Sequence, residues 1–297
     1  MEFVIAGVTI SPLLLAGIGF LVGILGGFFG VGGGFIGGPL MYWAGVPMNF
    51  VVGTDLAHMT GKSIIATRRH RAMGHVDIKV GLLMVISSIV GVEIGARMIE
   101  MLKEVGSVDV VVGVTYIAIQ VAVSLFTAWE SIRALRIKSA GGTAAKDAVG
   151  FQSFTKRIHS IKLPPVISLP VSGIESISLW VVLGVGLFTG ILSGLLGIGG
   201  GFVRMPLLIY VMGIPTHVAV GTDLFEIIIS AGFGTITHAL KGNVDISMAL
   251  MMQIGAAFGA QMGAVATRFF SGPRIRLAFS ALPLIGAIMV ITRLLSG

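Results

Sequence analysis

The sequence predicts an all-α membrane protein that contains two inverted repeats of about five helical elements each. The 297-residue chain is 55% hydrophobic and only 11% charged, with a mean hydropathy of +1.00, whereas about a quarter of the residues in soluble domains are charged. The apolar phrase GILGGFFGVGGGFIGGPL (23–40) also returns as GILSGLLGIGGGFVRMPL (190–207). In each copy a glycine cluster interrupts the apolar run, which predicts broken or re-entrant helical hairpins that meet near the bilayer midplane.

The first repeat, residues 1–132, divides into five apolar elements. Ser11 and Pro12 are a typical N-cap and first residue of a helix. Asp77 and Asp109 can each cap a later span. We therefore expect helical elements near residues 12–29, 35–44, 48–67, 78–99 and 110–129, with a break at Gly30–Gly34.

The second repeat, residues 177–297, matches the first residue by residue. Residues 23–40 align with 190–207 at a shift of 167, and one residue inserted near Tyr210 makes the shift 168. Chance similarity between apolar segments would not keep polar positions in register, so the sequence indicates a duplication. The polar matches are Thr54–Asp55 with Thr222–Asp223, His70 with His238, and Asp77 with Asp245.

A polar segment, residues 133–176, separates the repeats and contains seven Lys and Arg residues. We interpret it as a cytoplasmic linker. Within it, AAKDAVGFQSFTKRIHSI (144–161) fits either a solvated linker or an amphipathic helix on the membrane surface.

The distribution of charge predicts the orientation of the chain. A net charge of +7 and a pI near 10.1 would suit a nucleic-acid partner, but the basic residues lie in short loops between apolar spans, so we exclude nucleic acid. If the loop Arg68–His75 faces the cytoplasm, the repeats are inverted, with fourteen of the 20 Lys and Arg residues inside and four outside. This positive-inside pattern predicts a multi-pass protein of the cell inner (plasma) membrane with both termini on the outer side.

The glycine clusters are candidates for an anion site. Where a helix stops and restarts within the membrane, its new N-terminus presents unpaired N–H groups and a positive dipole end. Glycine has no side chain to keep an anion away, so two such N-termini would form a cradle for it. The alternative is that the glycines only allow helices to cross closely. The residues expected to bind are Gly32, Gly33, Gly34, Gly199, Gly200 and Gly201.

Arg204 replaces Gly37 in the second copy and lies between apolar neighbours. A guanidinium inside a membrane needs an anionic partner, and its planar fork suits an oxyanion substrate. The alternatives are a salt bridge to Asp223 or Glu226, or a side chain that extends toward the membrane interface.

Other polar residues cluster near the GTDL motif of each repeat. His58 and Lys62 lie on one helical face, and Glu226 occupies the position equivalent to His58. We expect His58, Lys62 and the hydroxyls of Thr54 and Thr222 to contribute to substrate binding. Asp55, Asp223 and Glu226 are candidates for proton or cation coupling, and for the two aspartates the alternative is a structural role, either capping a helix or binding the backbone of the other half.

The sequences GVGGGFIGGPL and GIGGGFVRMPL, each followed by GTDL, resemble the sulfite exporter TauE/SafE family over nearly the whole chain. By position, the glycine motifs of that family fall on Gly30–Gly34 and Gly197–Gly201, and its polar motif falls on Thr54–Asp55 and Thr222–Asp223. The resemblance implies a secondary transporter of a small sulfur-containing anion, such as sulfite or an organosulfonate.

We therefore predict an exporter that works by alternating access, with proton coupling, and with a small anion and the lipid bilayer as its partners. The alternatives are an uptake transporter or passive channel for sulfate, thiosulfate or another small anion, and an intramembrane enzyme or assembly factor. Against an enzyme, the sequence has neither a HExxH motif nor a Ser/His/Asp set in a usable context, and it contains no cysteine. We expect no cofactor and no metal, and a homo-oligomer is compatible with the sequence.

Overall fold

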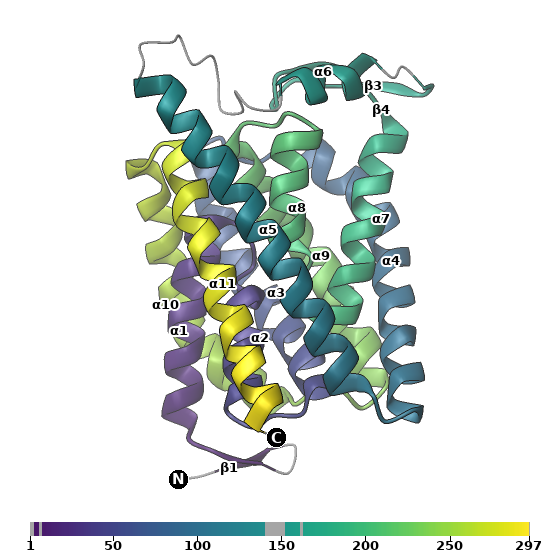
Figure 1. Ribbon diagram of the computed structural model, residues 1–297, viewed down its shortest axis with the longest axis vertical. Helices are drawn as coiled ribbons and strands as arrows, with labels where there is room; N and C mark the ends of the chain where they lie inside the picture. The colour runs from purple at the N-terminus through teal and green to yellow at the C-terminus, as the bar shows by residue number, and fades with distance from the viewer. Residues whose placement is uncertain (1–2, 6–7, 140–151, 161–162, 297) are drawn as a thin grey trace.

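The computed structural model describes residues 3–5, 8–139, 152–160 and 163–296, and Figure 1 shows them as a bundle of upright helices. A hairpin of β1 (Phe3–Ile5) and β2 (Val8–Ile10) precedes the first half and lies, like the C-terminus, at the lower end of the view. The helices of the first half are α1 (Pro12–Phe29), α2 (Gly34–Trp43), α3 (Met48–Ala72), α4 (Ile78–Glu104) and α5 (Val108–Ser139).

The second half repeats this succession of elements, and its first helix begins at the upper end of Figure 1, whereas α1 begins at the lower end. Its helices are α7 (Leu179–Leu196), α8 (Gly201–Pro206), the π-helical turn η1 (Leu207–Val211), α9 (Thr216–Leu240), α10 (Ile246–Ala266), the 3₁₀ turn η2 (Thr267–Phe269) and α11 (Gly272–Ser296). Between the halves lie α6 (Gln152–Ser160) and the hairpin of β3 (Val166–Leu169) and β4 (Ile174–Ser178).

Seven helices of the described residues are long and apolar enough to cross a membrane, namely α1, α4, α5, α7, α9, α10 and α11. α3 is equally long, but its polar residues, including His58 and Lys62, lower its hydropathy. α2 and the pair α8–η1 are too short to span. The predicted class, an all-α membrane protein, is confirmed.

Both helix breaks occur where the sequence predicts them. α1 ends at Phe29 and α2 begins at Gly34, while α7 ends at Leu196 and α8 begins at Gly201. Within each break three glycines have φ values between 62° and 77°, a region that residues with a Cβ rarely adopt. The glycines are therefore needed for the turn itself.

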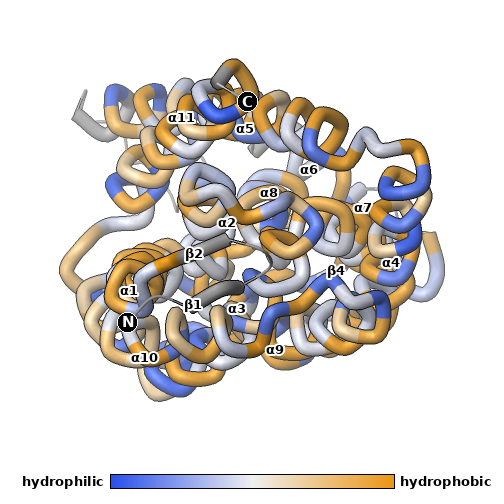
Figure 2. The backbone as a smooth tube through the Cα atoms, turned by 90° about the horizontal axis from the view of Figure 1, so that it is seen from below, coloured by the Kyte–Doolittle hydropathy of each residue, from blue (hydrophilic) through white to orange (hydrophobic). Residues whose placement is uncertain are grey.

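The two halves pack mainly on each other. α1 packs on α10, α4 on α7, α3 on α9 and α5 on α11. In Figure 2, α2 and α8 lie in the middle, between α5 and α11 on one side and α3 and α9 on the other. Small residues allow the close approach: Gly23 lies against the backbone of Ala256, and Gly190 against that of Ser88.

Several helix ends differ from their predicted positions. α3 continues to Ala72 and α5 to Ser139, because Arg, Lys and Glu end an apolar stretch but are good helix formers. Asp77 caps α4 as predicted and its equivalent Asp245 caps α10. Asp109 does not cap its own helix. It lies inside the first turn of α5, and its carboxylate accepts a hydrogen bond from the backbone N–H of Met48, the first residue of α3, at 3.1 Å.

The linker contains more structure than a polar composition suggests. The hairpin β3–β4 was not predicted, and of the segment 144–161 only residues 152–160 are helical, the others lying outside the described residues. Thr155 Oγ1 donates to the carbonyl of Tyr210 at 2.8 Å, and His159 Nε2 donates to that of Met212 at 2.9 Å. α6 is thus hydrogen-bonded to the end of η1.

Candidate functional site

The two helix breaks touch each other in the middle of the protein. A Cβ atom at Gly34 would lie 2.8 Å from the Cα of Ile198, and one at Gly201 would lie 2.8 Å from the carbonyl carbon of Val31. The restarting N-termini of α2 and α8 therefore come together, each beside the break of the other half.

A small apolar cluster joins α3 of the first half to α9 of the second. It consists of Leu56, Met59, Ile227 and Ala231, all buried. Met59 and Ile227 are equivalent positions at the shift of 168. A Cβ atom at Gly32 or at Gly199 would collide with the methyl end of Met59, which would have to move. This cluster lies where the two breaks meet.

The first polar group lies on α3 and consists of Asp55, His58 and Lys62, each 1% exposed. His58 Nδ1 lies 3.1 Å from Asp55 Oδ1. Lys62 Nζ lies 3.0 Å from the Cβ position of Gly33, next to the N-terminus of α2. Within the described structure Lys62 Nζ, His58 Nε2 and Asp55 Oδ2 have no hydrogen-bond partner. Because a buried charge is costly unless it is paired, these three atoms are suited to receive a polar ligand or water.

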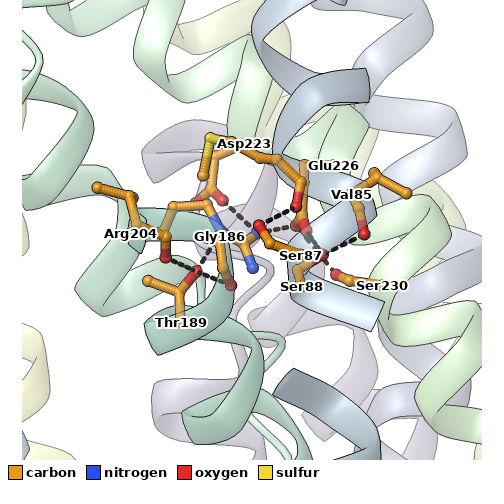
Figure 3. A network of polar contacts seen from close by, with 11 residues as sticks. Val85, Ser87, Ser88, Gly186, Thr189, Arg204, Asp223, Glu226 and Ser230 are labelled. Atoms are coloured by element: carbon orange, nitrogen blue, oxygen red, sulfur yellow. Dashed lines mark hydrogen bonds and ion pairs between the residues drawn. The ribbon is translucent and has the colours of Figure 1, made fainter. Parts of the chain in front are cut away.

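The second polar group surrounds Arg204, which is fully buried (Figure 3). Arg204 Nη1 forms ion pairs with Asp223 Oδ1, at 2.9 Å, and with Glu226. Its Nε donates to Thr189 Oγ1 at 3.1 Å. The sequence leaves several alternatives open for Arg204, among them a salt bridge to Asp223 or Glu226. The structure contains this salt bridge, and it involves both acids.

Glu226 is further held by two hydroxyl groups. Ser88 Oγ of α4 donates to Glu226 Oε1 at 2.5 Å, and Ser230 Oγ donates to Oε2 at 3.0 Å. Figure 3 shows these hydroxyls around the carboxylate, on the side away from Thr189. The network joins α4 of the first half to α7, α8 and α9 of the second.

The GTDL threonines link the two halves to each other. Thr54 Oγ1 accepts a hydrogen bond from the backbone N–H of Asp245 at 3.0 Å, and Thr222 Oγ1 accepts one from that of Asp77 at 2.8 Å. Asp55 and Asp223 do not cap their own helices, which begin seven residues earlier, at Met48 and Thr216. They face the restarting helices instead: Asp55 Oδ2 lies 2.9 Å from the Cβ position of Gly34, and Asp223 Oδ2 lies 2.8 Å from that of Gly201.

A comparison with protein families agrees with this architecture. The model of the family described as "Sulfite exporter TauE/SafE" matches residues 15–290, which include both breaks and both polar groups. The chain belongs to this family.

The curated relatives of this TauE/SafE protein are named as transporters. The "Probable membrane transporter protein YunE" of Bacillus subtilis is 27% identical over 266 residues, which are 87% of this chain and 89% of the relative. The "Probable membrane transporter protein MJ0441" of Methanocaldococcus jannaschii is 26% identical over 291 residues, covering 91% of each chain. No solved structure is significantly similar. The protein is thus a multi-pass membrane transporter of the TauE/SafE type.

Sequence reasoning missed two residues of α5 that hold α2 in this TauE/SafE protein. Tyr116 Oη donates to the carbonyl of Gly34 at 2.5 Å, and Gln120 Nε2 donates to that of Phe35 at 2.9 Å. Pro39, four residues after Phe35, has no N–H to donate to this carbonyl, and Gln120 replaces the missing bond. The sequence contains a signal for these contacts: the polar residues Tyr116 and Gln120 are four positions apart and therefore lie on one face of an otherwise apolar helix.

Ser88 and Thr189, which complete the network around Arg204, carried no such signal. Each is a lone hydroxyl in an apolar helix. Thr189 Oγ1 accepts from Arg204 and donates to the carbonyl of Val185. The single hydroxyl hydrogen of Ser88 lies within reach of both Glu226 and the carbonyl of Val85. A bond to the carbonyl three or four residues earlier is the usual arrangement of Ser and Thr in membrane helices. Their contacts depend on how the halves dock.

Proposed function

We propose that the protein is a secondary transporter that exports a small sulfur-containing oxyanion, such as sulfite or an organosulfonate, in exchange for or together with protons. The observation that carries this proposal is Lys62: a buried ammonium without a hydrogen-bond partner in the described structure, beside the N-terminus of α2. Helix N-termini and ammonium groups both favour anions.

The anion would bind on the first-half side of the breaks. Lys62 Nζ has no hydrogen-bond partner in the described structure and would donate to its oxygens, together with the N–H groups of Gly33 and Gly34. His58 Nε2 would donate only when the ring is protonated, because the Nδ1–H of the neutral ring faces the carboxylate of Asp55. On the second-half side Arg204 is already paired with two carboxylates. We therefore assign Lys62, rather than Arg204, the larger share of the affinity when these acids are ionised.

The balance of charge supports proton coupling. With His58 neutral, the two groups hold two cationic side chains, Lys62 and Arg204, and three carboxylates, those of Asp55, Asp223 and Glu226. An incoming anion would make this buried site still more negative, which is unfavourable in a low-dielectric interior. Protonation of Glu226 or Asp223 would offset that charge and weaken the hold of the acids on Arg204, which could then contact the anion.

Alternating access would come from two inverted repeats, residues 1–132 and 177–297, that rock against each other. The opposite starting ends of α1 and α7 in Figure 1 and the reciprocal bonds of Thr54 and Thr222 support this symmetry. The cluster around Met59 and Ile227 would be the barrier between the two polar groups. From the charge distribution we place the linker 133–176 in the cytoplasm and both termini on the outer side of the plasma membrane.

The test is flux of labelled sulfite and a short organosulfonate in proteoliposomes, measured from each side, with and without a pH gradient. A transporter gives saturable flux that an imposed pH gradient drives uphill. Faster net movement from the cytoplasmic face, after the orientation of the protein in the vesicles has been determined, supports export, and the reverse supports uptake. Flux that neither saturates nor responds to the gradient would identify a channel, and sulfate or thiosulfate as the preferred ion would replace the proposed substrate.

A further inference from the structure

A basic groove lies at the C-terminal end of α3, where α3 meets α10. It has a volume of about 400 Å³ and is lined by Ile64, Ile65, Arg68, Arg69 and Ala72 of α3 and by Gln261 of α10. Arg69 Nη2 donates to Gln261 Oε1 at 3.1 Å, which fixes this guanidinium across the groove. The groove thus has an apolar floor and a cationic edge.

A second groove lies on the other side of the same helix. Its volume is about 270 Å³, and it shares Ile64 and Arg68 with the first. Arg71 adds a third guanidinium, and Phe225 and Ile228 of α9 provide an apolar wall. Ile64, which is 53% exposed, forms the ridge between the two grooves, and Arg68 stands one turn beyond it.

The charges of this region are unbalanced. Among the residues that the structure describes, no acidic side chain lines either groove, and none forms an ion pair with Arg68, Arg69 or Arg71. The three guanidinium groups are exposed at the end of a helix whose preceding turn carries an outward-facing isoleucine. Basic residues at the end of an apolar surface match the boundary between acyl chains and anionic headgroups.

We propose that this end of α3 is a binding site for an anionic diacyl phospholipid. The phosphate would lie among Arg68, Arg69 and Arg71, whose planar forks suit phosphate oxygens. The two acyl chains would run down the two grooves, one on each side of Ile64. The site is separate from the anion site between the helix breaks, and the proposal does not depend on the transported substrate.

The test uses the purified full-length protein in detergent, with phosphatidylglycerol, phosphatidylcholine or inorganic phosphate added, and measures the midpoint of thermal unfolding. Since a ligand that binds the folded state raises this midpoint, we expect phosphatidylglycerol to raise it by about 3 °C more than phosphatidylcholine does. Arg68→Gln/Arg69→Gln should remove the difference. Arg274→Gln, which changes an exposed arginine in the first turn of α11, should keep it.

Ile64→Trp provides a second variant in which the arginines remain. The larger indole ring at the ridge between the grooves should obstruct the path of the acyl chains and reduce the phosphatidylglycerol effect at least threefold. A wild-type protein that responds equally to both lipids, or a response that survives in Arg68→Gln/Arg69→Gln, would overturn the proposal. A full response to inorganic phosphate, or a full lipid response in Ile64→Trp, would show that the acyl chains are not bound and would overturn it too.

Discussion

Lys62 Nζ lies 3.0 Å from the position that a Cβ atom would occupy at Gly33. A side chain at position 33 would collide with Val22, whose carbonyl oxygen lies 2.6 Å from the same position, and would also meet the ammonium, so only glycine fits beside Lys62. The break in the helix and the buried cation thus define one small site, to which α2 contributes its N-terminus and α3 its charge.

Lys62→Met should abolish anion binding and at the same time stabilise the protein without ligand. The substitution removes a buried charge that has no hydrogen-bond partner in the described structure, so the free energy of unfolding should rise by on the order of 1–3 kcal/mol. Isothermal titration with sulfite measures the binding, and thermal unfolding measures the stability. Lys103→Met, at a half-exposed lysine that pairs with Glu100, is the control. A destabilised Lys62→Met protein would mean that Lys62 has a structural partner.

Glu226→Gln should uncouple anion flux from the pH gradient. An amide at this position can accept a hydrogen bond from Ser230 through its oxygen and donate one to Ser88 Oγ through its nitrogen, in place of the two bonds that the carboxylate accepts, but it does not titrate. We expect downhill flux to remain and gradient-driven accumulation to fall at least tenfold. Ser230→Ala, which removes one hydrogen bond and no charge, should retain the coupling. Normal accumulation in Glu226→Gln would assign the coupling to Asp223 or Asp55 instead.

The outcome for Arg204 shows what a sequence can and cannot predict here. The break, its glycines and the equivalence of the halves were predictable, because the special backbone conformation and the duplication each leave a local pattern. The partner of Arg204 was not, because Asp223 and Glu226 lie about two and about three helical turns into α9 and reach Arg204 only after α8 has folded back onto that helix. Sequence reasoning could list both acids as alternatives without choosing between them and a substrate.

The same limit explains the missed contacts of the first half. Asp109 lies in the first turn of α5, and an aspartate at such a place is a typical cap for its own helix. Its carboxylate instead accepts a hydrogen bond from the backbone N–H of Met48, which lies 61 residues earlier in the chain. A local pattern specifies that a cap is possible but not which helix end comes within reach. Hydropathy likewise placed the end of α3 near Thr67, because it measures where apolar residues stop, whereas the helix continues to Ala72.

Gln120→Leu should destabilise the protein more than Ser124→Ala does. Gln120 Nε2 donates to the carbonyl of Phe35, which Pro39 leaves without its helical partner. Leaving a buried carbonyl unsatisfied costs about 1–3 kcal/mol. Ser124 Oγ also donates to a backbone carbonyl, that of Ser280, but no proline deprives that carbonyl of its helical partner. Equal losses of stability in the two variants, measured by thermal unfolding, would contradict the proposed role of Gln120.

His75 should make the protein sensitive to acid. It lies in the loop after α3, where burial and then the neighbouring His217, whose ring centroid is 5.1 Å away, lower the pKa of His75 below its ordinary value of 6.5. The unfolded chain takes up a proton there below about pH 6.5, while the folded protein does so only at lower pH. The free energy of unfolding should therefore decrease as the pH falls below this value. In His75→Gln the decrease between pH 7 and pH 5 should be smaller, and an identical pH profile would contradict this.

Gly32 and Met59 should be energetically coupled. Gly32 has a φ of 66°, so Gly32→Ala carries a backbone cost of about 1–2 kcal/mol. Its new methyl group would also meet the methyl end of Met59. Met59→Ala makes room for that group but leaves the backbone cost, so the double variant should be more stable than the sum of the single changes predicts, by on the order of 1 kcal/mol. Gly74→Ala, at a φ of 74° with no atom within 4 Å of the new Cβ, isolates the backbone cost. If the stability changes of Gly32→Ala and Met59→Ala simply add in the double variant, Met59 does not fill the junction of the two breaks. The barrier proposed there would then lose its central side chain.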